Sequence, residues 1–357
     1  MRTAINAAIA LTGLVGVLAT TAQARPFNDP RSERIPALET DAAFASQPRD
    51  PACHTSTLAS TGGALPAGPS TLAIRWTGFA NFELSYKGQI ILLDAYFDRG
   101  SNFPSLGFKA ADITRANVIL IGHGHHDHMS DAASVGIRTG ATIVGAPLTT
   151  DKLLAQSVDP QKIRTVSGRE NVTLDFGVFK VEPILGRHGD PPKTLVDAFS
   201  AALRATTPKL TDEQLTEFAA IRSRGTQDPR VRTEGTIAYF ITLDNGFRIM
   251  YRDSGGRVTD FEKAAMERIG RVDVALVAES ASYLNTETVP RALEHVRAYK
   301  PDVYIPAHHD AAYNNLWRAT EPLFQAVKDE SPNIVTVSKG YREPVCFNTD
   351  HNISRAR

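Results

Sequence analysis

Cysteine is scarce in this chain, and neither sign of charge dominates it. Two cysteines among 357 residues exclude a disulfide-rich scaffold and any zinc site built from four thiolates. The 39 lysines and arginines equal the 39 aspartates and glutamates, so no global field favours nucleic acid or an anionic membrane. A hydrophobic fraction of 42% and a charged fraction of 22% are typical of a globular protein and exclude wholesale disorder.

Long apolar runs are absent after the first 24 residues. Residues 4–18 form an uncharged, mostly apolar run behind Arg2, and Ala22-Gln23-Ala24 is typical of a signal-peptide cleavage site. An uncleaved membrane anchor is the alternative, but the polar interruptions and the small residues at the end favour cleavage. We therefore expect a signal peptide over residues 1–24 and a periplasmic or secreted mature protein without stable membrane insertion.

Export changes the interpretation of the two cysteines. An oxidising compartment favours a disulfide between Cys53 and Cys346, which would tie the N-terminal extension to the C-terminal segment. Two inert buried thiols are the alternative, since neither position resembles a nucleophile motif.

The rest of the chain divides into an arm, one large domain and a tail. Residues 25–70 are rich in proline, alanine, serine and aspartate and predict an extended arm. Strand and helix signals then alternate over residues 71–345, with hairpins in both halves, which favours an α+β domain of two mixed sheets with helices outside. The predicted strands are 72–76, 82–86, 90–93, 118–121, 141–144, 172–174, 178–185, 237–243, 247–251, 272–278, 303–305 and 334–337. The predicted helices are 148–156, 212–223, 260–269, 290–299 and 312–327, before a tail over residues 346–357.

Residues 189–233 interrupt this alternation. They contain Pro191-Pro192, a helical stretch, and the four arginines Arg222, Arg224, Arg230 and Arg232. A lid over a site and an inert surface excursion are both open interpretations of this insertion. The arginines fit either cations for an anionic substrate or a solvated surface.

One stretch carries most of the chemistry: Ile121-Gly122-His123-Gly124-His125-His126-Asp127-His128-Met129. Imidazole and carboxylate are ligands that zinc and similar metals accept. Where the predicted strand 118–121 gives way to a turn, His123 and His125 can bind one ion. Asp127 and His128 come near the start of the next helix and are displaced toward a second ion. Since four polar side chains at a strand end need partners, the stretch predicts a metal site.

This motif resembles the metallo-β-lactamase superfamily, and further segments extend the resemblance over about residues 70–340. Trp76-Thr77-Gly78-Phe79-Ala80-Asn81-Phe82 and Leu92-Leu93-Asp94 are closer to one branch, that of ascorbate-6-phosphate lactonase-like hydrolases and N-acylphosphatidylethanolamine phospholipase D. The resemblance implies a four-layer αββα sandwich with a helical insertion.

The remaining metal ligands are also implied by the resemblance. His188 matches the third histidine of the family, Asp253 matches a turn aspartate that bridges both metals, and His308 matches the histidine of a strand-Pro-x-His pattern. An ordinary Asx turn is the alternative for Asp253, because Arg252 stands where the family has glycine. The implied ligand set is His123, His125 and His188 for one ion, Asp127, His128 and His308 for the other, and Asp253 between them.

The other histidines have weaker support. For His126 and His309, a solvent-facing or supporting role is favoured over catalysis, with substrate contact as the alternative for His309. His54, His295 and His351 have no supporting pattern and are expected to be structural or surface residues.

Together these features predict a hydrolase with two divalent metal ions, expected to be zinc, with manganese or iron as alternatives. Two dications would lower the pKa of a bridging water, and the resulting hydroxide would attack an ester, lactone or phosphodiester. Asp127 is expected to hold or shuttle the proton. A non-haem iron oxygenase or oxidoreductase on the same fold and a non-catalytic metal-binding protein are the alternatives. The expected partner is a small-molecule substrate and not nucleic acid, and the sequence leaves the oligomeric state open.

Overall fold

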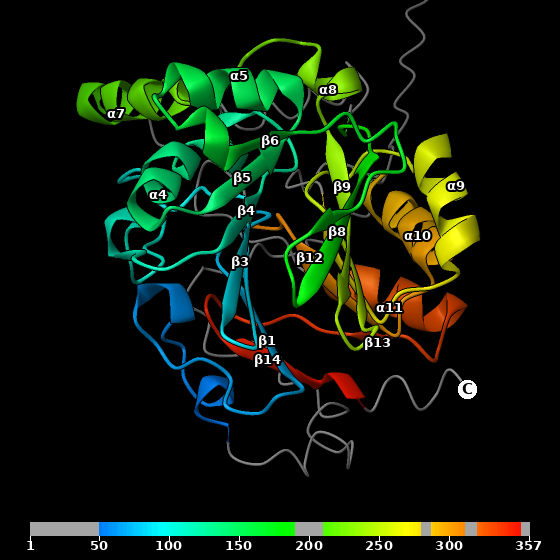
Figure 1. Cartoon of the computed structure of the whole chain (residues 1–357). Coiled ribbons are helices and arrows are strands. Elements are labelled where there is room, and N and C mark those ends of the chain that lie inside the picture. Colours follow the sequence, from blue (N-terminus) through cyan, green and yellow to red (C-terminus); the bar gives the residue numbers. More distant parts are fainter. Residues whose placement is uncertain (1–49, 190–209, 280–286, 311–319, 351–357) are drawn as a thin grey trace, which may run out of the picture.

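The computed structural model of the chain describes residues 50–189, 210–279, 287–310 and 320–350. In these residues, two seven-stranded sheets pack face to face, with helices on their outer faces (Figure 1). In spatial order, the first sheet contains β14 (Pro344–Asn348), β1 (Thr71–Trp76), β2 (Phe82–Tyr86), β3 (Gln89–Leu93), β4 (Val118–Leu120), β5 (Thr142–Gly145) and β6 (Ile163–Thr165). The second contains β13 (Val335–Thr336), β12 (Val303–Ala307), β11 (Val274–Ala278), β10 (Arg248–Arg252), β9 (Ile237–Leu243), β8 (Phe179–Leu185) and β7 (Leu174–Asp175).

Helices complete the outer layers. The α-helices are α3 (His126–Met129), α4 (Ala132–Thr139), α5 (Pro147–Ala155), α7 (Asp212–Ser223), α8 (Val231–Glu234), α9 (Asp260–Ile269), α10 (Thr288–Tyr299) and α11 (Glu321–Glu330). The short 3₁₀ helices are η1 (Pro51–Cys53), η2 (Ala59–Thr61), η3 (Ala110–Asp112) and η4 (Pro160–Lys162). The predicted αββα sandwich of the α+β class is confirmed.

Three apolar cores hold these layers together. The central core lies between the sheets and includes Leu84 and Leu120 from one sheet and Leu276 from the other. A second core joins the outer face of the first sheet to α4 and α5, and a third joins the second sheet to α9, α10 and α11. Strands such as β11 are therefore buried along their whole length, which explains their continuous apolar sequence.

Strand direction brings distant parts of the sequence together. In the first sheet β3, β4 and β5 are parallel neighbours, and in the second β10, β11 and β12 are parallel neighbours. Since β8 and β10 both pair antiparallel with β9, the strand β8 runs in the same direction as β10. The carboxyl ends of β8, β10 and β12 therefore lie at the same edge of their sheet.

Most predicted elements lie within a few residues of the observed ones. At the hairpins this agreement arises because glycines in the sequence mark the turns and so fix where the strands end. Gly88 and Gly246 have φ angles of 76° and 89°, in the left-handed region that a tight turn needs. Helix α4 is absent from the prediction. Residues 312–319 of the predicted helix 312–327 lie outside the described residues, and α11 begins only at Glu321.

The described part of the predicted extended arm is folded against the first sheet, which corrects the prediction. Buried Glu83 of β2 accepts hydrogen bonds from the backbone of Ala59 and Ser60 in η2, both at 2.8 Å. Residues 25–49 lie outside the described residues.

The boundary of the predicted tail is also corrected. Strand β14 pairs with β1 from Thr71 opposite Asn348 to Arg75 opposite Pro344, so the domain continues past residue 345. A disulfide joins Cys53 to Cys346, with Cα atoms 5.9 Å apart, and so fastens η1 to this edge strand.

Of the predicted insertion 189–233, the structure describes residue 189 and residues 210–233. Helix α7 of this insertion packs against α3, the helix of the histidine motif. Among the described residues, no helix combines the length and apolarity that a membrane span requires.

Candidate metal centre

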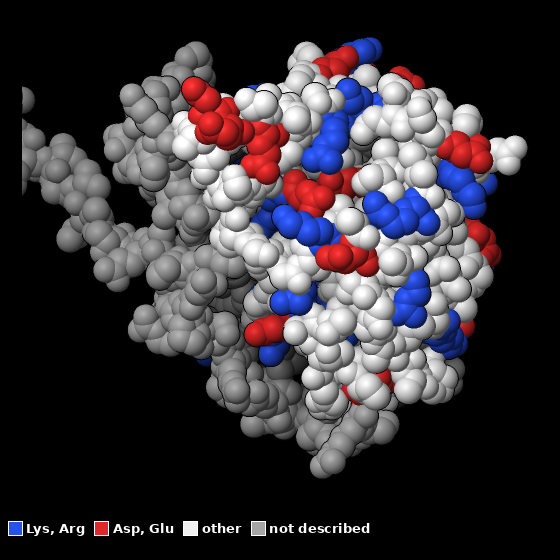
Figure 2. All heavy atoms as spheres, turned by 90° about the vertical axis from the view of Figure 1, so that its left-hand side faces the viewer, with Lys and Arg blue, Asp and Glu red and all other residues white. Residues whose placement is uncertain are grey.

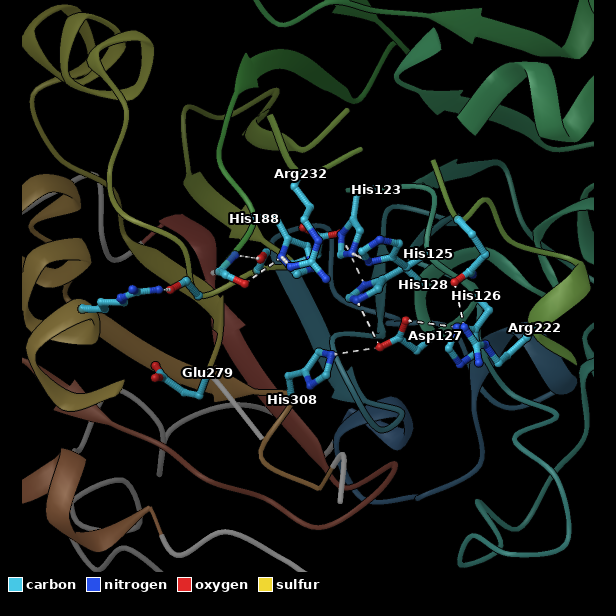
Figure 3. Close-up of a pocket in the computed structure, with 16 residues that line it drawn as sticks. His123, His125, His126, Asp127, His128, His188, Arg222, Arg232, Glu279 and His308 are labelled. Atoms are coloured by element: carbon cyan, nitrogen blue, oxygen red, sulfur yellow. Dashed lines mark hydrogen bonds and ion pairs between the residues drawn. The ribbon is translucent and has the colours of Figure 1, made fainter. Parts of the chain in front are cut away.

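The seven predicted ligands come from four loops at the carboxyl ends of strands. The histidine motif follows β4, His188 follows β8, Asp253 follows β10 and His308 follows β12. Figure 3 shows the five labelled histidines of this set and Asp127 converging on one pocket, which Asp253 also lines. Their donor atoms form three groups, each within 4.8 Å, that could hold a metal ion: His123, His125 and His188; His123, His128 and Asp253; and Asp127, His128 and His308.

The first group is a cluster of three imidazoles. The rings of His123 and His125 lie 4.7 Å apart, and His188 lies 4.8 Å and 4.9 Å from them. Burial lowers the pKa of all three, and for His125 to about 4. The rings are therefore neutral near pH 7, which is the form of histidine that coordinates metals.

The group of Asp127, His128 and His308 lies around the carboxylate of Asp127. One oxygen of this carboxylate, Oδ2, lies 3.7 Å from His128 Nε2 and 3.5 Å from His308 Nε2 (Figure 3). His308 has a φ of 61°, a left-handed conformation that a histidine seldom adopts. Such strained backbone is common at functional sites, where the surrounding structure fixes it.

Asp253 lies between the cluster of three imidazoles and the group around Asp127. Its Oδ2 is 2.5 Å from His123 Nδ1 and 3.3 Å from His128 Nδ1. Its Oδ1 is buried and has no hydrogen-bond partner among the described residues, and burial raises the pKa of this carboxyl to about 6. A buried carboxylate oxygen without a donor is costly, and a cation is the partner that would satisfy it. The donor set therefore fits a bound metal ion.

Gly122 is required by this packing. A Cβ atom at this position would lie 2.0 Å from Asp253 Cγ, so any side chain there would displace the carboxylate. The glycine before the first histidine therefore lets the loops that follow β4 and β10, in different sheets, approach closely.

Asp94 belongs to the site, although the sequence predicts no role for it there. It directly follows β3 of the first sheet, is fully buried, and accepts hydrogen bonds from His128 Nδ1 at 2.6 Å and Gly122 N at 2.8 Å. These contacts turn His128 Nε2 toward Asp127. The strand ending in Asp94 is visible in the sequence, but its contact with a histidine 34 residues away is not.

Arg252 does not disturb the turn that carries Asp253. Its buried guanidinium donates to the carbonyls of Arg187 at 2.8 Å, Gly256 at 2.9 Å and Arg257 at 3.1 Å. It thereby links the loop of His188 to the loop of Asp253. Instead of a glycine turn, a buried arginine holds these two loops together.

The remaining histidines fall into different environments. His126 lines the pocket and packs edge-on against Phe218 of α7 at 5.5 Å. His309 is buried and stacks on Trp76 at 4.4 Å, outside the group of pocket-lining residues. His295 is buried, with its Nε2 2.8 Å from the Gly256 carbonyl oxygen, and His54 is exposed. His351 lies outside the described residues.

These features define a metal-binding αββα protein, and the family comparison agrees. Residues 89–309 match the Beta-lactamase superfamily domain, so the chain belongs to this superfamily. The comparison does not distinguish the branch within it.

Individual relatives are similar in sequence to parts of this chain. A UPF0173 metal-dependent hydrolase from Methanopyrus kandleri is 38% identical over 74 residues, which are 21% of this chain and 30% of the relative. One from Thermoplasma acidophilum is 24% identical over 256 residues, which are 72% of this chain and 90% of the relative. Matches to other relatives of this name span between 30% and 49% of their length.

Solved structures share the fold. The metallohydrolase Igni18 from Ignicoccus hospitalis superposes with a TM-score of 0.55 at 14% identity, over 78% of this chain and 98% of Igni18. An isothiocyanate hydrolase from Delia radicum gut bacteria gives 0.50 at 13% identity, over 77% and 98%. At these identities the likeness concerns the fold alone.

Proposed function

We propose that this chain is a metal-dependent hydrolase whose site binds two divalent ions. Its membership of the superfamily and the names of its relatives support metal-dependent hydrolysis. The number of ions is inferred from the donor groups. The two outer groups match the two predicted ligand sets, and the middle group shares one histidine with each and contains Asp253. This overlap is the observation that carries the proposal.

In the proposed site, His123, His125 and His188 hold one ion, and Asp127, His128 and His308 hold the other. Asp253 lies between them and would contribute its carboxylate to both ions. Asp94 fixes the orientation of His128 through its Nδ1, an arrangement that strengthens a metal-binding histidine. Zinc suits this set of imidazoles and carboxylates, and manganese or iron would also be accepted.

Bound divalent ions supply two kinds of chemistry, activation of water near neutral pH and polarisation of a carbonyl or phosphoryl oxygen. Asp127 is 23% exposed, and its carboxylate lies beside both His128 and His308 at the wall of the pocket. We assign it the role of orienting the attacking water and holding its proton. The proposed substrates are carboxylic esters, lactones and phosphodiesters.

Metal analysis and hydrolysis assays on the same preparation test this proposal. We expect about two metal ions per chain, and hydrolysis of para-nitrophenyl acetate or bis(para-nitrophenyl) phosphate that a chelator abolishes and zinc or manganese restores. His123→Ala should lose this activity, whereas exposed His54→Ala should keep it. One iron per chain, with oxygen uptake in place of hydrolysis, would identify an oxygenase instead. Bound metal without turnover of any substrate in a broad panel would favour a non-catalytic protein.

A further inference from the structure

The pocket over the metal donors contains three arginines in addition to histidines and carboxylates. It has a volume of about 360 Å³, and Arg222, Arg232 and Arg291 line it together with the seven donor residues. This volume suits a small molecule. Figure 3 shows Arg232 beside His188 and Arg222 beside His126, so cations flank the donor cluster on two sides.

The two insertion arginines in the pocket differ from the two outside it. Arg224 pairs with buried Asp131 at 3.0 Å, and Arg230 pairs with Asp228 at 2.6 Å. Neither of these lines the pocket, whereas Arg222 and Arg232 do. The insertion therefore places selected arginines, and not a uniform basic surface, next to the metal donors.

Backbone contacts fix the insertion to the histidine motif. Thr226 N donates to the Gly124 carbonyl at 2.7 Å, and a Cβ atom on Gly225 would lie 2.4 Å from His126 N. Arg222 donates to Gln227 Oε1 at 2.9 Å, and Arg232 Nη1 lies 3.2 Å from His188 Nδ1. The guanidinium groups are thus positioned relative to the metal donors by the packing of the insertion.

The charge balance of the pocket favours an anionic ligand. Among its described lining residues, Arg222, Arg232 and Arg291 balance the carboxylates of Asp127, Asp253 and Glu279 in formal charge. Any bound divalent ion then leaves the pocket positive. By contrast, Figure 2 shows acidic and basic side chains interspersed on the face of the molecule that it presents. Since lysines and arginines equal aspartates and glutamates in the whole chain, the positive charge of the metal-loaded pocket is a local property.

We infer that the substrate carries an anionic group, a carboxylate or a phosphate, which Arg222 and Arg232 bind while the metal donors act on the scissile bond. The inference rests on the proposed hydrolase function and narrows its substrate class. Guanidinium groups match both anions because their N–H donors are arranged in a planar fork. Arg291 of α10, a helix that packs on the second sheet, adds a third cation to the pocket lining.

Matched charged and neutral esters test the inference on the zinc-loaded full chain. The carboxylate probe is para-nitrophenyl hemiadipate and its neutral partner is the methyl-capped diester. The phosphonate probe is the para-nitrophenyl ester of phosphonopropionic acid, with its dimethyl phosphonate as the neutral partner. We expect kcat/KM for at least one charged probe to exceed that of its neutral partner by about tenfold or more. The probe that is preferred distinguishes carboxylate from phosphate.

Substitutions assign the preference to the arginines. Arg222→Gln and Arg232→Gln should each lower kcat/KM for the charged probe about tenfold, mainly through KM, because a charge-assisted hydrogen bond is lost. The loss for the neutral probe should be smaller, because this probe lacks the anionic group that the two arginines bind, so the ratio of the two kcat/KM values falls. Arg230→Gln, an exposed arginine of the same insertion that lies outside the pocket, is the matched control and should behave like the parent. No preference for charge, or a preference that both pocket variants retain, would overturn the inference.

Calorimetry separates this result from failure of the hydrolase proposal. If no probe is hydrolysed, the titration of phenylphosphonate and adipate into the zinc-loaded protein still measures anion binding. Binding that weakens about tenfold in Arg222→Gln and Arg232→Gln, but not in Arg230→Gln, supports the anion site without hydrolysis. Equal binding by all four proteins, or no binding, overturns it.

Discussion

At the scale of single residues, Asp94 determines how His128 faces the proposed metal centre. It accepts from His128 Nδ1 and from Gly122 N through different oxygens. Asp94→Asn keeps the shape but replaces one acceptor with an NH₂ group, so one of these contacts must be lost. We expect zinc affinity at the His128 site to fall 10- to 100-fold, as is typical when the partner of a ligating histidine is removed. Competition with a chelating dye measures this affinity.

The control for Asp94 is Asp151→Asn, which removes an exposed carboxylate of α5 and should leave zinc affinity unchanged. If Asp94→Asn bound two ions as tightly as the parent, the orienting role of Asp94 would be wrong.

Arg252 is the second residue whose substitution should be severe. Its guanidinium is fully buried, contacts three carbonyl oxygens and lies 3.5 Å from Glu262. Arg252→Met leaves the buried Glu262 carboxylate without its cation and removes the guanidinium donor from the three carbonyls, so we expect a loss of about 3–5 kcal/mol in the free energy of unfolding. Urea denaturation measures this loss.

Arg271→Met is the matched control, because Arg271 forms an ion pair with Asp302 in which both side chains are about half exposed. Loss of this pair should cost less than about 1 kcal/mol. Similar costs for the two variants would show that the link between the loops of His188 and Asp253 contributes little.

At the scale of secondary-structure elements, the close packing of the insertion on α3 depends on Gly225. A methyl group there would meet His126 N at 2.4 Å and Cα at 2.6 Å, both backbone atoms that cannot rotate away. We expect Gly225→Ala to destabilise the fold by about 1–3 kcal/mol, as overpacking does, and to lower the metal content of the purified protein. Urea denaturation and metal analysis measure the two effects.

Gly186→Ala offers a comparison at a second glycine near the site. Its added methyl group would meet nothing closer than 3.6 Å, so we expect unchanged or slightly higher stability. Normal stability and metal content in Gly225→Ala would contradict the proposed docking of the insertion.

The sequence predicts those parts of the site whose residues lie close together in the chain. The strand, turn and helix around His123 are contiguous, so the sequence alone predicts a metal site there. His188, Asp253 and His308 lie in three separate loops, and only the family resemblance links them to that motif. The structure brings all of them together, as the donor groups show.

Three features that depend on packing between distant segments were not predicted from the sequence. Arg252 stands where the family has glycine, so the sequence argues against a normal turn at Asp253. The sequence does not show that the Arg252 side chain joins two loops and thereby holds this turn in place. The predicted extended arm fails for the same reason, since Glu83 accepts from η2 across 24 residues of sequence. Which arginines of the insertion line the pocket is likewise set by packing.

At the scale of the whole molecule, the Cys53–Cys346 disulfide joins segments 293 residues apart. It connects η1 to β14, the edge strand of the first sheet. Because a cross-link restricts the unfolded chain, we expect removal by Cys53→Ser with Cys346→Ser to lower the free energy of unfolding by about 2–5 kcal/mol. Urea denaturation with and without a reductant measures this change.

The double variant is also the control for the reductant, which should weaken the parent and leave the variant unchanged. Equal stability of parent and variant would contradict a stabilising role of the disulfide.

The signal peptide lies outside the described residues, so export stays a prediction. Sequencing the N-terminus of protein collected from the periplasm or medium should find Arg25 first.

The central claim is that seven side chains from four loops hold two metal ions. Anomalous diffraction from crystals of the metal-loaded protein tests it most directly. We predict two peaks: one about 2.0–2.2 Å from donor atoms of His123, His125 and His188, and the other at this distance from Asp127, His128 and His308, with Asp253 contacting both. A single peak, or two peaks without Asp253 or His308 among their ligands, would contradict the account.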